Sequence, residues 1–165
     1  TEHLMRRTSL INPKLAFQLI AELGVQDLNF AVGMITNPAK TSAQRDATLL
    51  AFRDYLTTIE DPKLRETLAF EGISSMITTA FFDGVDNGIQ VIGNGSFTHE
   101  EIESYVNRAG FDVSRNDAAK WIDWLAKEIP TANVTTQVIP RIFGDWVMAD
   151  YQAAGEWLTA SGHTA

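Results

Sequence analysis

The sequence predicts an all-α protein made of antiparallel helical hairpins, stacked either as a short solenoid or as an irregular bundle. Three observations support this prediction. Apolar residues recur every three or four positions along almost the whole chain, which is the spacing of one face of an α-helix. Capping residues, prolines and glycines interrupt that spacing at short intervals, and no strand pattern is convincing. The last third of the chain also carries a weak internal repeat.

The repeat has a period of 35 residues, which is typical of stacked helical hairpins. The matched apolar pairs are Phe111 with Trp146, Ala118 with Ala153, Ala119 with Ala154, Ile122 with Trp157, and Leu125 with Ala160. A similar helix opening occurs earlier, as Asn-Pro-Lys-Leu over 12–15 and as Asp-Pro-Lys-Leu over 61–64. In both places a capping side chain, Asn12 or Asp61, precedes a proline at the first helical position.

Cap signals place four helices in the first half of the chain. The first follows Asn12, ends near Gly24, and has one predicted inward face: Leu15, Ala16, Leu19, Ile20 and Leu23. The second is predicted over 25–36 and the third over 42–59. The fourth, over 63–82, has the broadest apolar face and is the best candidate for a central helix.

Residues 83–97 are predicted to form a glycine-rich connector with at most one short helical turn, over 89–92. The connector separates N-terminal helical hairpins over 1–82 from C-terminal Trp-rich hairpins over 98–165. One continuous domain is the alternative organisation. A chain that begins Thr-Glu-His, without an initiator methionine, is expected to be a processed or excised piece of a longer protein.

The C-terminal helices are also predicted from their ends. Thr98 opens a capping box, and Ser114 is the expected cap of the next helix. A further helix over 134–147 contains Pro140, which predicts a kink or a later start. Asp150 is the expected cap of the last helix.

Aromatic residues on these helices are the candidate partner-binding residues: Trp121, Trp124, Trp146, Tyr151 and Trp157, with Phe143 among them. Alanines lie between them, and this alternation of large and small side chains is typical of a packed helix interface. Core packing is therefore the favoured interpretation. The alternative is an exposed groove for a partner helix or peptide, because Trp and Tyr dominate binding hot spots.

Residues 146–158, Trp-Val-Met-Ala-Asp-Tyr-Gln-Ala-Ala-Gly-Glu-Trp-Leu, resemble the helical repeat of certain large bacterial proteins, in which a tryptophan precedes Asp-Pro-x-Ala-Ala and then Trp-Leu. The resemblance is best over 111–161 and looser over 12–23 and 61–69. It implies an α-solenoid-like scaffold in which the aspartate caps a helix and the alanines pack, and no catalytic residue is established in that repeat type. Tyr151 replaces the usual proline, and nothing in the pattern matches the segment 83–96.

The sequence predicts no catalytic residue and no cofactor. Cysteine is absent, as are the GxSxG, GxxxxGK[ST] and strand-linked GxGxxG motifs. Asp83, Asp86 and Asn87 resemble part of a calcium loop. Val85 and Asn94, however, stand where two oxygen ligands belong, so a turn-rich connector is favoured over a metal site. The sequence leaves open one alternative, an active site whose carboxylate pair is brought together only in three dimensions.

The chain is acidic, with a formal net charge of −8. Residues 83–165 contain twelve Asp and Glu against five Lys and Arg, and so carry most of the excess. This charge disfavours nucleic acid and favours a basic protein partner, although solubility is the simpler role. No apolar run approaches the roughly 20 residues of a membrane span.

These observations together predict a non-catalytic helical-repeat module for protein interaction or structure. The alternative is a helical enzyme or small-ligand-binding domain whose pocket lies between the glycine-rich connector and the Trp-rich hairpins.

Overall fold

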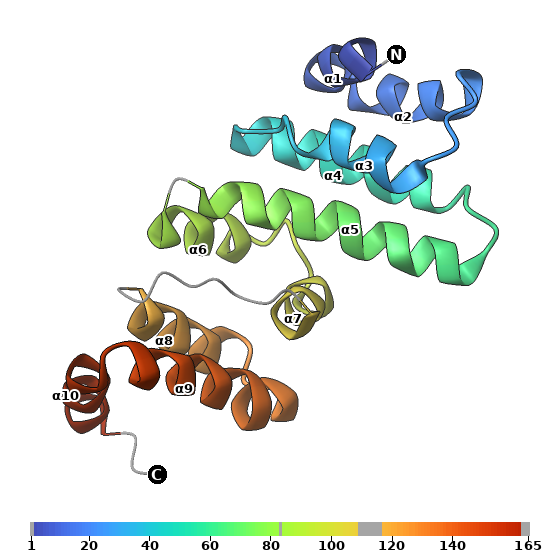
Figure 1. Cartoon of the computed structure of the whole chain (residues 1–165). Helices are drawn as coiled ribbons and strands as arrows, with labels where there is room; N and C mark the ends of the chain where they lie inside the picture. The colour runs from blue at the N-terminus through green and yellow to red at the C-terminus, as the bar shows by residue number, and fades with distance from the viewer. Residues whose placement is uncertain (1, 83, 109–116, 163–165) are drawn as a thin grey trace. The chain divides into compact units, whose positions relative to one another are not determined.

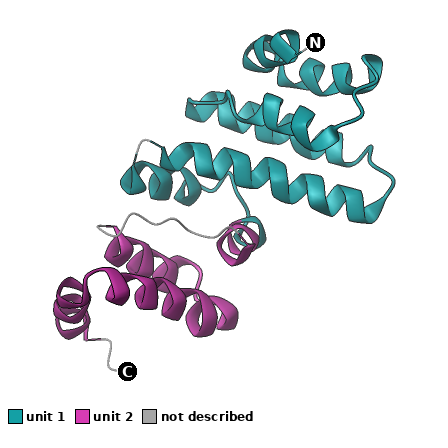
Figure 2. Ribbon diagram, in the orientation of Figure 1, with its two compact units in different colours: residues 1–101 teal, residues 102–165 magenta. Residues whose placement is uncertain are grey.

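The computed structural model describes residues 2–82, 84–108 and 117–162. These residues form ten α-helices and one π-helical turn, and no strand occurs among them. The predicted all-α fold class is therefore confirmed, whereas the solenoid order stays a prediction. The chain divides into two compact units, residues 1–101 and 102–165 (Figure 2).

Unit 1 contains six complete helices and the first turn of a seventh (Figure 1). They are α1 (Glu2–Ile11), α2 (Pro13–Glu22), α3 (Leu28–Thr36), α4 (Ser42–Leu56), α5 (Pro62–Phe81), α6 (Val85–Gly93) and the start of α7 (His99–Arg108). Helix α2 packs against α1 and α4, and α5 packs against α3 and α6. The long helix α5 thus has the central role that its broad apolar face predicts.

Side-chain caps set the starts of these helices. Asn12 Oδ1 accepts the Leu15 N–H at 3.0 Å, and Asp61 Oδ1 accepts the Lys63 N–H at 2.9 Å, so both predicted caps are confirmed. Helix α3 begins at Leu28 rather than at residue 25, because Asp27 caps it by accepting the Phe30 N–H at 2.9 Å. The cap shortens the predicted helix by three residues at its start.

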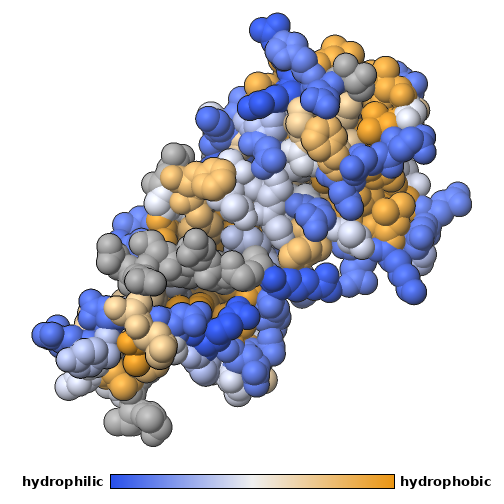
Figure 3. Space-filling model, viewed as in Figure 1, coloured by the Kyte–Doolittle hydropathy of each residue, from blue (hydrophilic) through white to orange (hydrophobic). Residues whose placement is uncertain are grey.

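The buried face of α2 differs from the predicted one. Ala16, Phe17 and Ile20 are buried, whereas Leu15 and Leu23 are more than two-fifths exposed. The buried direction follows Phe17, which packs onto the rings of α4 and so turns both leucines outward. Figure 3 shows apolar surface over the N-terminal helices, where the exposed apolar residues are Leu4, Leu10, Ile11, Leu15, Leu23 and Phe30.

The expected connector over 83–97 is largely helical, because α6 occupies Val85–Gly93. The glycines of this segment, which predict a loop from the sequence, have structural roles in the helix. Gly84 precedes the helix with a φ of 106°, a conformation that favours glycine. Gly88 faces α5, where an added Cβ would lie 2.2 Å from the Phe81 ring.

Unit 2 contains the rest of α7, α8 (Ala118–Glu128), the π-helical turn η1 (Val134–Val138), α9 (Ile139–Ala149) and α10 (Tyr151–Ser161). Pro140 predicts a kink or a later start, but the chain is helical from residue 132 onward, and the π-helical turn η1 interrupts the α-helix just before Ile139. The Ile139 N–H donates to the Val134 carbonyl, five residues earlier, which makes this turn wider than an α-helical one. In a regular α-helix the ring of Pro140 would clash with the carbonyl four residues earlier, and the wider turn leaves room for it. The predicted cap Ser114 and Phe111 of the repeat lie outside the described residues.

Polar contacts join the elements of unit 2. The Thr131 hydroxyl donates to Glu103 Oε1 at 2.7 Å, and Arg141 Nη2 donates to the Val106 carbonyl at 3.3 Å. Asp150 caps α10 as predicted, accepting the Ala153 N–H at 3.0 Å. The first two bonds join the segment after α8, and helix α9, to α7, and α9 itself packs against α8, η1 and α10.

Candidate functional site

Three of the aromatic residues of the last third lie together between α9 and α10. The Trp146 and Trp157 ring centroids are 5.7 Å apart, and Phe143 lies 6.2 Å from Trp146 and 5.9 Å from Trp157. We refer to Phe143, Trp146 and Trp157 as the α9–α10 aromatic cluster. The tilted and edge-on ring geometries are those that aromatic pairs prefer.

The remaining predicted residues are placed differently. Trp121 and Trp124 pair on α8 with centroids 5.5 Å apart. Trp121 is 1% exposed and Trp146 is 7% exposed, so both belong to the core of unit 2, while Trp124 and Trp157 are half-buried. Tyr151 is 78% exposed and makes no ring contact with the described residues. The five predicted residues therefore do not share one exposed surface.

Three exposed apolar residues lie where α9 ends and α10 begins. They are Val147, Met148 and Tyr151, which we call the α9–α10 rim, and Met148 is 89% exposed. Met148 follows the buried Trp146 by two positions, which turns it about 200° around the helix axis, away from the core. Sequence reasoning did not select Val147 and Met148, although their position off the buried stripe was a usable signal.

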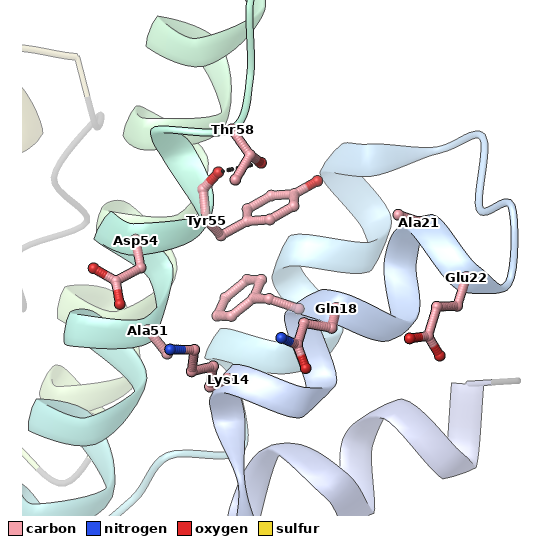
Figure 4. Close-up of a pocket in the computed structure, with 9 residues that line it drawn as sticks. Lys14, Gln18, Ala21, Glu22, Ala51, Asp54, Tyr55 and Thr58 are labelled. Carbon is pink, nitrogen blue, oxygen red and sulfur yellow. Dashed lines mark hydrogen bonds between the residues drawn. The ribbon is translucent and has the colours of Figure 1, made fainter.

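A second candidate site is a groove of about 510 Å³ in unit 1, between α2 and α4 (Figure 4). We call it the α2–α4 groove, and its lining residues are Lys14, Phe17, Gln18, Ala21, Glu22, Ala51, Asp54, Tyr55 and Thr58. Its volume lies within the range of ligand pockets. The lining residues on α2 and those on α4 are at least 29 positions apart in the sequence, so no local pattern indicates the groove.

The floor of the α2–α4 groove is the end of an aromatic stack. Phe17 lies between two rings of α4, with its centroid 5.5 Å from that of Phe52 and 5.1 Å from that of Tyr55. Phe52 and Phe17 are buried, whereas Tyr55 is half-buried and forms the outer end of the stack. Burial raises the pKa of the Tyr55 hydroxyl above its ordinary value, so this hydroxyl stays protonated at neutral pH.

Three charged side chains stand at the edges of the groove. Lys14 and Glu22 extend from α2, and Asp54 extends from α4 (Figure 4). All three are exposed, and none has an ion pair within the described part of the chain. The groove therefore combines an apolar aromatic floor with two carboxylates and one ammonium group.

The predicted metal candidates are only partly described. Asp83 lies outside the described residues, and Asn87 Nδ2 donates to the Ala80 carbonyl at 2.7 Å. Within the described ranges, no three His, Asp or Glu side chains are grouped so that they could hold a metal ion. None of the described helices is both long enough and apolar enough to cross a membrane.

Comparison with known proteins gives no match, since no family model, no curated protein and no solved structure is significantly similar to this chain.

Proposed function

We propose that this chain is a helical protein-interaction module that binds a partner through the α9–α10 rim. The observation that carries the proposal is the exposure of Met148 and Tyr151, at 89% and 78%, on a helix pair that is joined by a packed aromatic cluster. Single exposed apolar residues are common on protein surfaces. Several of them gathered at one helix junction are typical of an interaction site.

The packing behind the rim supports this function. Trp146 and Trp157 fix α9 against α10, so the rim side chains project from a rigid base. A rigid base lowers the entropy that binding must overcome. Covering Met148 or Tyr151 would contribute about 1.5–3 kcal/mol for each fully buried side chain, and tyrosine is enriched in binding hot spots.

Site-specific photo-crosslinking tests the proposal. A photoreactive phenylalanine replaces Tyr151 in one variant and Thr136, an exposed residue of η1, in the control. We expect a defined partner to be cross-linked from position 151 and not from position 136, and we expect Met148→Ser to reduce the yield severalfold. Equal yields at both positions, or a yield that Met148→Ser leaves unchanged, would rule out the rim as the binding surface.

A further inference from the structure

We propose that the α2–α4 groove binds an arginine side chain of a peptide segment from a protein partner. The groove belongs to unit 1, so this site goes beyond the proposed function of the α9–α10 rim. Three features of the groove favour this ligand: the aromatic stack, the charges at its edges and its size.

The aromatic stack favours a flat cation. Phe52, Phe17 and Tyr55 form a run of rings in which the two contacts have interplanar angles of 28° and 19°, and Tyr55 is the outermost ring. A planar guanidinium group continues such a stack through cation–π attraction and through stacking. The compact ammonium group of lysine gains only part of this interaction.

The charges at the groove edges favour the same ligand. Asp54 lines the groove from α4 and Glu22 lines it from α2, and neither has an ion pair within the described residues, so a cationic ligand in the groove meets two carboxylates. A guanidinium group presents several N–H donors in a fixed plane and pairs with carboxylates in two-pronged hydrogen bonds. Lys14 carries one positive charge that repels a guanidinium group. Its removal should therefore act in the opposite direction to removal of a carboxylate.

The size of the groove favours a peptide over free arginine. A volume of about 510 Å³, open between two helices, exceeds what one side chain occupies. Flanking residues of a peptide would cover the apolar parts of the groove beside Ala21 and Ala51. The net charge of −8 also favours the approach of a basic segment.

Titration by NMR tests this proposal with a short peptide that carries one central arginine between leucines. We expect the amide signals of Gln18 and Thr58 to shift on binding. A matched peptide with citrulline, which keeps the shape of arginine and lacks its charge, should bind at least fivefold more weakly. N-acetyl-arginine amide, which lacks the flanking residues, should also bind more weakly than the arginine peptide.

Charge variants of the groove give the decisive comparison. Asp54→Asn and Glu22→Gln should each weaken binding of the arginine peptide about two- to fivefold, as expected for exposed ion pairs. Lys14→Gln should strengthen it by a similar factor. Glu71→Gln makes the same charge change on α5, outside the groove, and should leave the affinity unchanged.

The ring and the rim supply two more controls. Tyr55→Phe keeps the stack and should keep the affinity, whereas Tyr55→Leu should weaken binding about two- to fivefold. Tyr151→Ala should have no effect, so failure of this site and failure of the α9–α10 rim are distinguishable. Equal binding of the arginine and citrulline peptides, equal effects of Asp54→Asn and Glu71→Gln, or no binding at millimolar peptide would each overturn the proposal.

Discussion

Gly72 shows how closely the helices of unit 1 approach at a single residue. A Cβ built on this glycine would lie 2.4 Å from the Phe52 ring and 3.0 Å from Val32. Phe52 is fully buried and stacks on Phe17, so it cannot turn away. The close contact between α5 and α4 at this point therefore requires a residue without a side chain.

Gly72→Ala should lower the free energy of unfolding by about 1–3 kcal/mol, because overpacking a buried ring outweighs the better helix propensity of alanine. Urea denaturation measures this change. Gly155→Ala is the matched control, since nothing lies within 4 Å of its added Cβ and α10 should gain roughly 0.5–1 kcal/mol. Equal effects of the two substitutions would contradict the close packing of α5.

Asn12 accepts one backbone N–H group, and Asp61 accepts two, that no carbonyl of their helix reaches. Replacing either with alanine should cost about 1 kcal/mol of stability, measured by urea denaturation. Asn29→Ala serves as control, because Asn29 is exposed within the first turn of α3 and makes no side-chain hydrogen bond to the described residues. Unchanged stability in both cap variants would show that these bonds contribute nothing in solution.

The helices of this chain differ in how well the sequence predicts them. Helices α2, α4 and α5 have strong caps and a 3–4 apolar spacing, and they were predicted to within a few residues. Of helix α6 the sequence predicts only one turn, over 89–92, because glycine has a low helix propensity. The packing of Gly88 against the Phe81 ring is not visible in the local sequence.

The same limit applies to the candidate sites. Spacing selected the tryptophans of unit 2 as a group, but the choice between core and surface depends on how α8, α9 and α10 pack. The α2–α4 groove needs Tyr55 to stack on Phe17 across 38 positions of the chain, and no periodicity encodes that contact. Sequence therefore located the helices better than the surfaces between them.

The α9–α10 hairpin separates a structural aromatic residue from an exposed one. Trp146→Ala should destabilise the fold by about 3–5 kcal/mol, because it empties a buried site beside Phe143 and Trp157. Tyr151→Ala should change stability by less than about 0.5 kcal/mol, since the side chain is largely exposed. Thermal unfolding distinguishes the two variants, and a large loss with Tyr151→Ala would place that ring in the core.

At the scale of the whole molecule, the acidic excess belongs to both compact units. Residues 1–101 contain thirteen acidic and eight basic residues, and residues 102–165 contain eight and five. The predicted concentration in the second half came from the division at residue 83, because 83–101 holds four acidic residues and no basic one. Two glutamates of α7 also have structural contacts. Glu101 pairs with Arg53 at 2.6 Å, and Glu103 accepts from Thr131.

A basic partner bound at the α9–α10 rim should therefore associate more slowly as ionic strength rises. Between about 0.05 M and 0.5 M salt the Debye length shortens to a few ångströms, so exposed charges stop guiding the encounter. Association rates measured by stopped flow should fall roughly tenfold or more, while dissociation changes little.

Asp145 is the charge to reverse in this experiment, because it is exposed and lies one helical turn before Met148 on α9. Asp145→Lys should slow association more than Glu71→Lys, which makes the same change in net charge on unit 1. Both variants should keep the dissociation rate, since neither residue belongs to the apolar contact. If association does not depend on salt, or if the two variants have equal effects, the charge serves solubility, and recognition rests on Val147, Met148 and Tyr151 alone.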